Sequence, residues 1–495
     1  MSQIKVSDLT FAYPGSYDNI FENASFQLDT DWKLGFTGRN GRGKTTFLKL
    51  LMGQYPYQGS ITASVAFDYF PFPVPHPDRL AGEALEELCP EVPHWRLLRE
   101  TAALQLDEEL LCRPFDTLSN GERTKLLLAL LFARENRFLL IDEPTNHLDL
   151  RGRELVSRYL NGKKGFILVS HDRAFLDGCV DHILSINKAT IEVQRGNFSS
   201  WWENKERQDR YELAENEKLK KEIKRLRETA REKAQWSDSA ERRKVGIDRT
   251  KVDNVKGWAP LQGAKSKKQM SRAKAIEGRQ QAAIEEKSKL LKNIEEAEAL
   301  KLTQLPYHSA RFVTARELSV DCGAGPVFEG LSFELRRGDR LAVLGPNGCG
   351  KSSLLKLVCG EDIPHGGTLE LGSRLVISYV PQDTGFLRGD LSAFARERQI
   401  DESLFKAILD KLDFSRVQFE KNMADFSAGQ KKKVLLAASL CERAHLHVWD
   451  EPMNYVDVLS RMQLEELILR AQPTLLLVEH DRAFCERVAT GAVTL

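Results

Sequence analysis

The chain has 495 residues, with 72 basic and 71 acidic side chains, and 42% of its residues are hydrophobic. That length predicts about three domains that each bury a core, and a charged fraction of 29% argues against a disordered or fibrous chain. The longest apolar run, Leu126–Ala133, is far shorter than the roughly 20 residues that span a bilayer. No two cysteines form a Cys-x-x-Cys pair, which fits reduced thiols. We therefore expect a cytoplasmic protein.

The first motif is a phosphate-binding loop between a predicted strand at 34–37 and a predicted helix that begins near residue 46. The loop matches the pattern in which glycines let backbone N–H groups point at phosphate oxygens beside a helix N-terminus. Lys44 is expected to contact the β and γ phosphates, and the Thr45 hydroxyl is expected to lie on Mg²⁺. The residues expected to contact the nucleotide are Gly38, Arg39, Asn40, Gly41, Gly43, Lys44, Thr45 and Thr46.

A carboxylate pair and a histidine follow two further apolar strands of the first half. The predicted strand at 138–141 ends in Asp142 and Glu143. The aspartate can hold the shell of a metal ion, and the glutamate, on the opposite side of the strand, can polarise a water for in-line attack. His171 follows the strand at 166–169, where a histidine is either a structural residue or a sensor of the γ-phosphate.

The middle of the chain is basic. Residues 201–300 contain 26 Lys or Arg and 19 Asp or Glu, and residues 241–280 alone have a net charge of +8. Apolar residues at helical spacing predict two long antiparallel helices, with a turn-rich tip between Val245 and Gly263. Basic side chains are interleaved with the aromatic Trp258 at the tip. RNA recognition often combines phosphate contacts and base stacking in this way, although Trp258 could instead close the end of the hairpin. The expected tip contacts are Lys251, Lys256, Trp258, Lys265, Lys267 and Lys268.

The motifs of the first half recur in the second at offsets of 307 to 309 residues, which indicates a duplication. Strands alternate with helical segments in both halves, which predicts an α/β class for each. A second histidine in the same register favours the sensor role for both histidines. The residues expected to serve the second site are Gly345, Asn347, Gly348, Gly350, Lys351, Ser352, Ser353, Gln382, Asp450, Glu451 and His480.

With these motifs the chain resembles the ABC ATPases in both halves, because Ser119-Asn-Gly121 and Ser427-Ala-Gly429 resemble the ABC signature. In that family the signature of one half closes over the nucleotide of the other, so the resemblance implies two sandwiched ATP molecules. It also implies Mg²⁺ as a cofactor and Tyr13 as the adenine-stacking residue. The metal contacts that it implies are Thr45, Asp142, Ser352, Gln382 and Asp450.

The continuation Pro144-Thr-Asn-His-Leu-Asp149 is typical of the ABC-F class, twin ATPases that act on ribosomes. Two departures suggest unequal sites, without indicating which hydrolyses ATP faster. Phe72 stands where the second half has Gln382, and Cys322 stands in the register of Tyr13. The resemblance therefore implies two ABC-type P-loop ATPase domains, at 1–200 and 304–495, joined by a long helical-hairpin linker at 201–303.

The resemblance further implies a role on the ribosome. The spacing from the loop lysine to the signature serine is 75 residues in the first half and 76 in the second, which leaves no room for the extra arm of some ABC-F factors. The chain is thus similar to the antibiotic-resistance members, which enter the tRNA exit site and move the linker tip toward the peptidyl-transferase centre. Expected partners are rRNA and P-site tRNA, with no membrane or permease, and the protein is expected to be a monomer with an intramolecular pair of ATPase domains.

Two alternatives stay open at this point. A housekeeping ABC-F translation factor without a resistance role would have the same motifs. The duplicated ATPase subunit of a membrane importer would have a similar length, but it would dock a permease and join its halves by a short connector. The basic segment of about one hundred residues argues against the importer.

Overall fold

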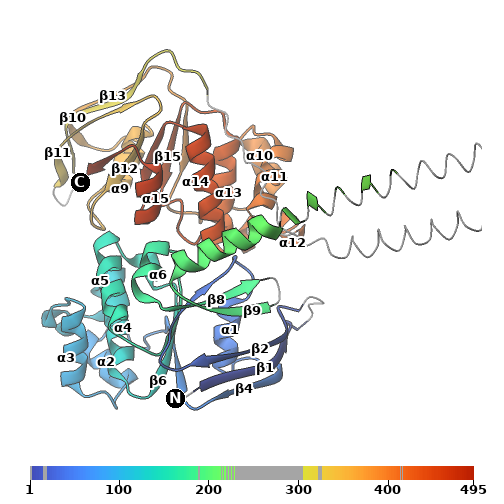
Figure 1. The fold of residues 1–495 in the computed structure, drawn as a ribbon. Helices are drawn as coiled ribbons and strands as arrows, with labels where there is room; N and C mark the ends of the chain where they lie inside the picture. Colours follow the sequence, from blue (N-terminus) through green and yellow to red (C-terminus); the bar gives the residue numbers. More distant parts are fainter. Residues whose placement is uncertain are drawn as a thin grey trace, which may run out of the picture. The chain divides into compact units, whose positions relative to one another are not determined.

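The computed structural model describes most of the two halves and the beginning of the segment between them (Figure 1). The described residues are 3–14, 19–187, 190–212, 214–215, 217–218, 221, 224–225, 228, 305–321, 326–412, 414 and 416–495. The chain separates into two compact units, one that joins Met1–Trp201 to Ala297–Leu495 and one at Trp202–Glu296. Both halves that carry a phosphate loop therefore belong to a single unit.

The first half is built on a six-stranded sheet with the order β5-β6-β7-β3-β8-β9. All neighbouring strands are parallel except β8 and β9, which are antiparallel. The strands are β3 (Lys33–Thr37), β5 (Ala66–Phe70), β6 (Arg137–Asp142), β7 (Phe166–Val169), β8 (His182–Asn187) and β9 (Thr190–Arg195). Because parallel strands are covered on both faces, β6 and β7 consist almost entirely of buried apolar residues.

A smaller antiparallel sheet has the order β2-β1-β4. The helix that follows the phosphate loop lies between this sheet and the six-stranded sheet (Figure 1). The strands of the smaller sheet are β1 (Gln3–Phe11), β2 (Phe21–Asp29) and β4 (Gln58–Ala63). The ring of Phe47 in α1 (Lys44–Leu51) lies 6.1 Å from Phe21 of the small sheet and 5.6 Å from Phe36 of the large sheet. Helix α1 is therefore held between two layers, which fixes the phosphate loop at its N-terminus.

The remaining helices of the first half follow in the chain order of the motifs. They are α2 (Ala81–Leu88), α3 (His94–Ala103), α4 (Asn120–Ala133), α5 (Leu150–Asn161) and α6 (Arg173–Cys179), with short 3-10 helices η1 (Glu108–Cys112), η2 (Phe115–Thr117) and η3 (Pro144–His147). Among the described helices of the whole chain, none is both long and apolar enough to cross a membrane.

The second half repeats the plan with a parallel sheet of order β14-β15-β16-β12-β17 and an antiparallel sheet of order β11-β10-β13. Its strands are β10 (Arg311–Asp321), β11 (Pro326–Arg336), β12 (Arg340–Leu344), β13 (His365–Leu371), β14 (Ile377–Val380), β15 (Leu446–Asp450), β16 (Leu475–Val478) and β17 (Gly491–Thr494). Its helices are α9 (Lys351–Val358), α10 (Leu391–Glu397), α11 (Glu402–Lys411), α12 (Arg416–Phe419), α13 (Ala428–Cys441), α14 (Val458–Ala471) and α15 (Arg482–Val488), with η4 (Met423–Asp425). The predicted α/β class is confirmed for both halves.

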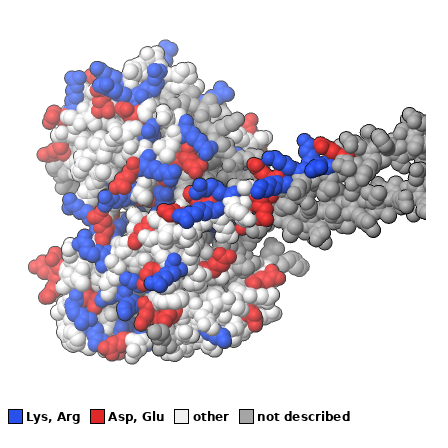
Figure 2. Space-filling view, in the orientation of Figure 1, with Lys and Arg blue, Asp and Glu red and all other residues white. Residues whose placement is uncertain are grey.

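The basic segment begins in a helix that starts at residue 198 and continues through the described positions of the second unit. Within the second unit, opposite charges alternate along this helix (Figure 2), and Arg207 lies 3.2 Å from Glu203 one turn away. Such pairs stabilise an exposed helix by only tenths of a kcal/mol. The predicted returning helix and the tip, including all six tip residues, lie outside the described residues.

Candidate nucleotide sites

Both phosphate loops end in a helix whose first residue is the predicted lysine. Gly43 and Gly350, which precede α1 and α9, have φ angles of 94° and 88°. A Cβ atom at Gly43 would lie 2.4 Å from Ile20 Cγ2, so only glycine fits this left-handed position. Each lysine Nζ donates to the loop carbonyls, as Lys44 does to Gly38 O at 2.7 Å. An ammonium and an unpaired helix N-terminus are thus brought together, which favours a bound anion.

In the first half the carboxylate pair lies at the end of β6, as predicted. Asp142 Oδ2 accepts hydrogen bonds from Thr45 Oγ1 at 2.8 Å and from the Tyr69 hydroxyl at 3.0 Å. Glu143 has a φ of 50°, an uncommon backbone conformation for a residue with a side chain, and its Oε1 lies 3.3 Å from His171 Nε2. Burial and the neighbouring Asp142 raise the pKa of Glu143 to about 8.

In the second half the corresponding glutamate has more partners. Glu451 Oε2 accepts hydrogen bonds from Gln382 Nε2 at 2.8 Å and from Asn454 Nδ2 at 2.6 Å. His480 Nε2 lies 3.5 Å from the other carboxylate oxygen. Burial opposes ionisation, but His480 and Gln382 outweigh it and hold the pKa of Glu451 below its usual range. The pKa of Glu143 is therefore shifted above its usual value, whereas the pKa of Glu451 is shifted below it.

The signature serines cap the helices that follow them. Ser119 accepts a hydrogen bond from Glu122 N and Ser427 accepts one from Gln430 N, each in a reciprocal capping box that begins α4 or α13. The glycine two residues on allows close approach, because a Cβ at Gly429 would lie 2.5 Å from the Tyr455 carbonyl oxygen. Each signature thus presents a capped helix N-terminus and a residue without a side chain.

Each phosphate loop meets the opposite half of the chain. Asn347 Nδ2 donates to His147 O at 3.4 Å, and Asn40 Nδ2 donates to Tyr455 O at 2.8 Å. A cavity of about 970 Å³ lies between the loop of the second half and the signature of the first. Its lining includes Ser119, Gly121, Asn347, Lys351, Ser352, Ser353, Gln382, Glu451 and His480. This volume suits a nucleotide-sized ligand.

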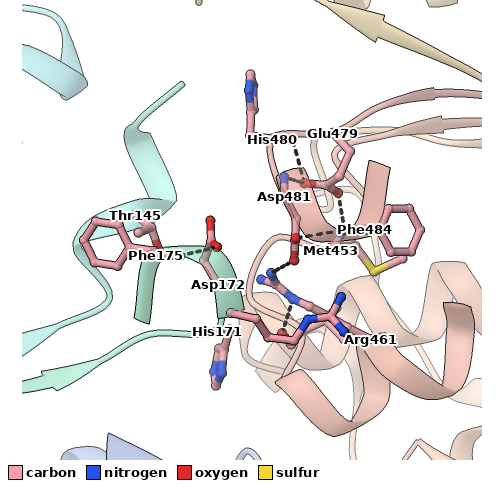
Figure 3. Close-up of polar contacts among 12 residues, drawn as sticks. Thr145, His171, Asp172, Phe175, Met453, Arg461, Glu479, His480, Asp481 and Phe484 are labelled. Atoms are coloured by element: carbon pink, nitrogen blue, oxygen red, sulfur yellow. Dashed lines mark hydrogen bonds and ion pairs between the residues drawn. The ribbon is translucent and has the colours of Figure 1, made fainter. Parts of the chain in front are cut away.

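The segments after β7 and β16 are braced by buried ion pairs. Asp172 accepts from Arg153 Nη1 at 2.9 Å in the first half. In the second half Asp481 accepts from Arg461 Nη1 at 2.9 Å (Figure 3). The halves differ one residue before each histidine, where the second half has Glu479 in place of a serine. Glu479 accepts hydrogen bonds from the backbone N–H of Met453 at 3.1 Å and of His480 at 2.8 Å.

The described residues next to the loops fit a hydrated Mg²⁺ ion. Asp450 Oδ1 is buried and has no hydrogen-bond partner among the described residues, and a carboxylate oxygen is a ligand that Mg²⁺ prefers. Burial raises the pKa of Asp142 and of Asp450, an effect that a bound cation would reverse. Hydroxyls at Thr45 and Ser352 complete each donor set.

The predicted adenine platform of the first site lies beside its loop. The Tyr13 hydroxyl lies 2.8 Å from Thr46 Oγ1, and the Tyr13 ring makes edge contacts with Phe11 and Tyr55, at centroid distances of 5.2 and 5.7 Å. Tyr13 is 39% exposed. Cys322, its counterpart in register, lies outside the described residues.

Sequence reasoning missed three polar residues near the sites. Asn454 bonds Glu451, Lys432 bonds backbone carbonyls beside the second site, and Glu465 binds Arg173 of the other half. Burial lowers the pKa of Lys432 to about 8. The sequence did contain a signal for Lys432. This lysine lies within the apolar pattern of a helix, and a charged residue is rarely buried there without a partner.

Two duplicated α/β halves whose phosphate loops face each other's signatures define a twin P-loop nucleotide-binding protein. A family model described as ABC transporter matches residues 21–146 and 328–454, just over half of the chain. The chain therefore belongs to the ABC transporter family. It is an ATP-hydrolysing enzyme, and its relatives together with the motif Pro144–Asp149 assign it to the ABC-F class, as the sequence predicted.

Two curated relatives span almost the whole chain. The ribosome protection protein VmlR of Bacillus subtilis is 28% identical over 98% of this chain and 85% of its own length. The energy-dependent translational throttle protein EttA of Haemophilus influenzae is 25% identical over 95% of this chain and 88% of its own. A solved structure of the archaeal ribosome recycling factor aABCE1, in complex with the stalk protein aP1, has a TM-score of 0.63 at 20% identity. It covers 98% of this chain and 87% of that chain, and it supports the fold alone.

Proposed function

We propose that the protein binds two ATP molecules with Mg²⁺, each between the phosphate loop of one half and the signature of the other. The contacts of Asn347 with His147 and of Asn40 with Tyr455 support this arrangement most directly. In it, Lys44 and Lys351 bind phosphate oxygens. The residues that would hold the metal are Thr45 and Ser352 through their hydroxyls and Asp142 and Asp450 through their carboxylates, with Gln382 beside the second site. Bound Mg²⁺ would neutralise charge on the phosphates.

The chemistry assigned to this chain is proton handling and charge stabilisation. Glu143 and Glu451 each accept the proton of the attacking water. His171 and His480 lie 3.3 and 3.5 Å from these carboxylates, and we assign them the role of γ-phosphate sensors. The backbone N–H groups at the capped signature helices of Ser119 and Ser427 face the same phosphate from the opposite half.

We further propose that the protein acts on the ribosome and that its basic linker contacts rRNA. The net charge of +7 in residues 201–300 suits a polyanion, and two relatives are named for a role in ribosome protection and in translation. Within this class we favour ribosome protection, in which the linker tip with Trp258 displaces an antibiotic from the peptidyl-transferase region. A translation factor without a resistance role is the second candidate, because the similarity to EttA covers 95% of the chain, nearly as much as the 98% for VmlR.

Co-sedimentation with 70S ribosomes tests the ribosome assignment. The Glu143→Gln/Glu451→Gln variant is expected to stay in the ATP-bound form and to pellet with ribosomes when ATP is present, but not when ADP is present. Pelleting that is independent of nucleotide and of the linker lysines would contradict the proposal.

Drug susceptibility then separates the two candidates. A host that expresses the chain should tolerate drugs of the peptidyl-transferase centre, and Trp258→Ala should remove that tolerance while most ribosome binding and the ATPase activity remain. Unchanged susceptibility with the parental chain, despite ribosome binding, would favour the translation factor.

A further inference from the structure

Lys432 is a buried lysine at the edge of the second ATP site. It lies in α13, in the second turn after the signature serine, and its exposed fraction is 2%. Its Nζ donates hydrogen bonds to Pro381 O and Asp450 O, both at 2.9 Å, and lies 3.5 Å from Gln382 O. Removing an ammonium from water is costly unless it is hydrogen-bonded. A lysine buried at this position therefore indicates a specific role for its hydrogen bonds.

The carbonyls that Lys432 binds belong to two different segments. Pro381 and Gln382 follow β14, and Asp450 ends β15. The ammonium of Lys432 has three N–H donors, so it can bind carbonyls of both segments at once and bridge them. The bridge fixes the backbone of the loop on which Gln382 is carried, and the Gln382 side chain in turn donates to Glu451 Oε2 at 2.8 Å.

The first half offers an internal comparison at the same position. Thr124 is the counterpart of Lys432 at the offset of 308 residues, and its side chain is too short to span two strands. Thr124 lines a cavity of about 440 Å³ that also borders Pro71 and Glu143. Where the second half has a bridging ammonium, the first half has open space beside its candidate base.

We propose that Lys432 is a positioning residue of the second ATP site, which holds the loop of Gln382 against the end of β15 and so keeps Glu451 in place for hydrolysis. This inference rests on the proposed role of Glu451. It predicts that the second site, whose base is held before ATP arrives, hydrolyses ATP faster than the first. Lys432 is not among the residues that line the cavity of about 970 Å³ at the second site.

The test measures the second site alone, in a chain that carries Glu143→Gln. In that chain Lys432→Met, which keeps the length of the side chain without its donors, should lower kcat by about 10- to 100-fold, because small displacements of a catalytic group have effects of this size. KM for ATP should change little, since the phosphate loop is untouched. Lys356→Met, which makes the same substitution at an exposed lysine of α9 in the same half, is the matched control and should leave both constants unchanged.

Two measurements without turnover separate positioning from a structural role. In the nucleotide-free protein, Lys432→Met should increase hydrogen–deuterium exchange in the loop 381–385 while exchange in β12 and β16 stays unchanged. Lys432→Arg, which restores a cation with several donors, should recover part of kcat and of the loop protection. If Lys432→Met fails to fold, Lys432→Thr, with the residue of the first half, replaces it.

Unchanged kcat in a folded Lys432→Met variant would overturn the inference. Hydrogen–deuterium exchange in the loop 381–385 equal to that of the parent would do the same. So would a Lys432→Arg variant whose kcat and loop protection are no higher than those of Lys432→Met. The result is also separable from the proposed function. If Glu451→Gln retains turnover at the second site, the role of Glu451 is wrong. If Glu451→Gln is inactive and Lys432→Met is fully active, only the role of Lys432 is wrong.

Discussion

Replacing Arg173 by alanine should weaken the ATP-bound closed state much more than replacing Arg482, its counterpart in the other half. Arg173 begins α6 in the first half, and both of its terminal nitrogens bind Glu465 of α14 in the second, one of them at 3.3 Å. The Glu465 side chain is fully buried and also accepts from Arg487 at 3.1 Å. Arg482 instead reaches Glu154 at 3.2 Å, in a pair whose side chains are 57% and 48% exposed.

The burial of the two pairs sets the expected magnitudes. Removing one partner of a buried ion pair costs about 3–5 kcal/mol, whereas an exposed pair is worth about 0–1 kcal/mol. Burial raises the pKa of Glu465 despite Arg173 beside it, and Arg487 stays bound when Arg173 is lost. We therefore expect about 2 kcal/mol for Arg173→Ala, or about a 30-fold change in the closing equilibrium. For Arg482→Ala we expect less than about fivefold.

Equilibrium binding of a fluorescent ATP analogue measures this effect in chains that also carry Glu143→Gln and Glu451→Gln. Half-saturation should move to about 30-fold higher concentration with Arg173→Ala and should barely move with Arg482→Ala. Arg487→Ala, which breaks a bond within the second half, should lower the melting temperature without this loss of affinity. Equal shifts for Arg173→Ala and Arg482→Ala would refute the reasoning from burial.

Three further outcomes are expected. Glu143→Gln with Glu451→Gln should reduce ATP hydrolysis by at least about 100-fold without loss of ATP binding, because an amide cannot accept the proton of water; near-parental turnover would exclude both as bases. In the single variant Glu451→Gln, kcat/KM should rise with pH up to about 8, because protonated Glu143 is inactive below its raised pKa, whereas Glu143→Gln should give a flat profile there. Changing the linker lysines Lys265, Lys267 and Lys268 to glutamate should reduce the salt dependence of ribosome binding by a slope of about 3; an unchanged slope would place the rRNA contact elsewhere.

The sequence predicted the parts of the fold that depend on local order. The glycines of each loop, the strands that end in Asp142 and Asp450, and the near-constant offset between the halves are all readable along the chain. The antiparallel sheets were not predicted, because β1 pairs with β4 across 48 to 59 residues and its alternation is broken by bulges. The contact between Arg173 and Glu465 joins positions 292 residues apart, so it depends on how the halves dock rather than on any local pattern.

The duplicated halves share a backbone plan but differ in the polar side chains around it. Several positions of the first half hold small residues where the second half holds charged ones, for example Thr124 against Lys432, Ser157 against Glu465, Ser170 against Glu479 and Gly178 against Arg487. Each charged member makes hydrogen bonds or ion pairs that its small counterpart is too short to form. Since local opening begins where the fewest bonds must break, the segments around Glu143 should loosen before those around Glu451. Among the described residues, the second site thus holds its candidate base Glu451 through more polar contacts than the first site holds Glu143.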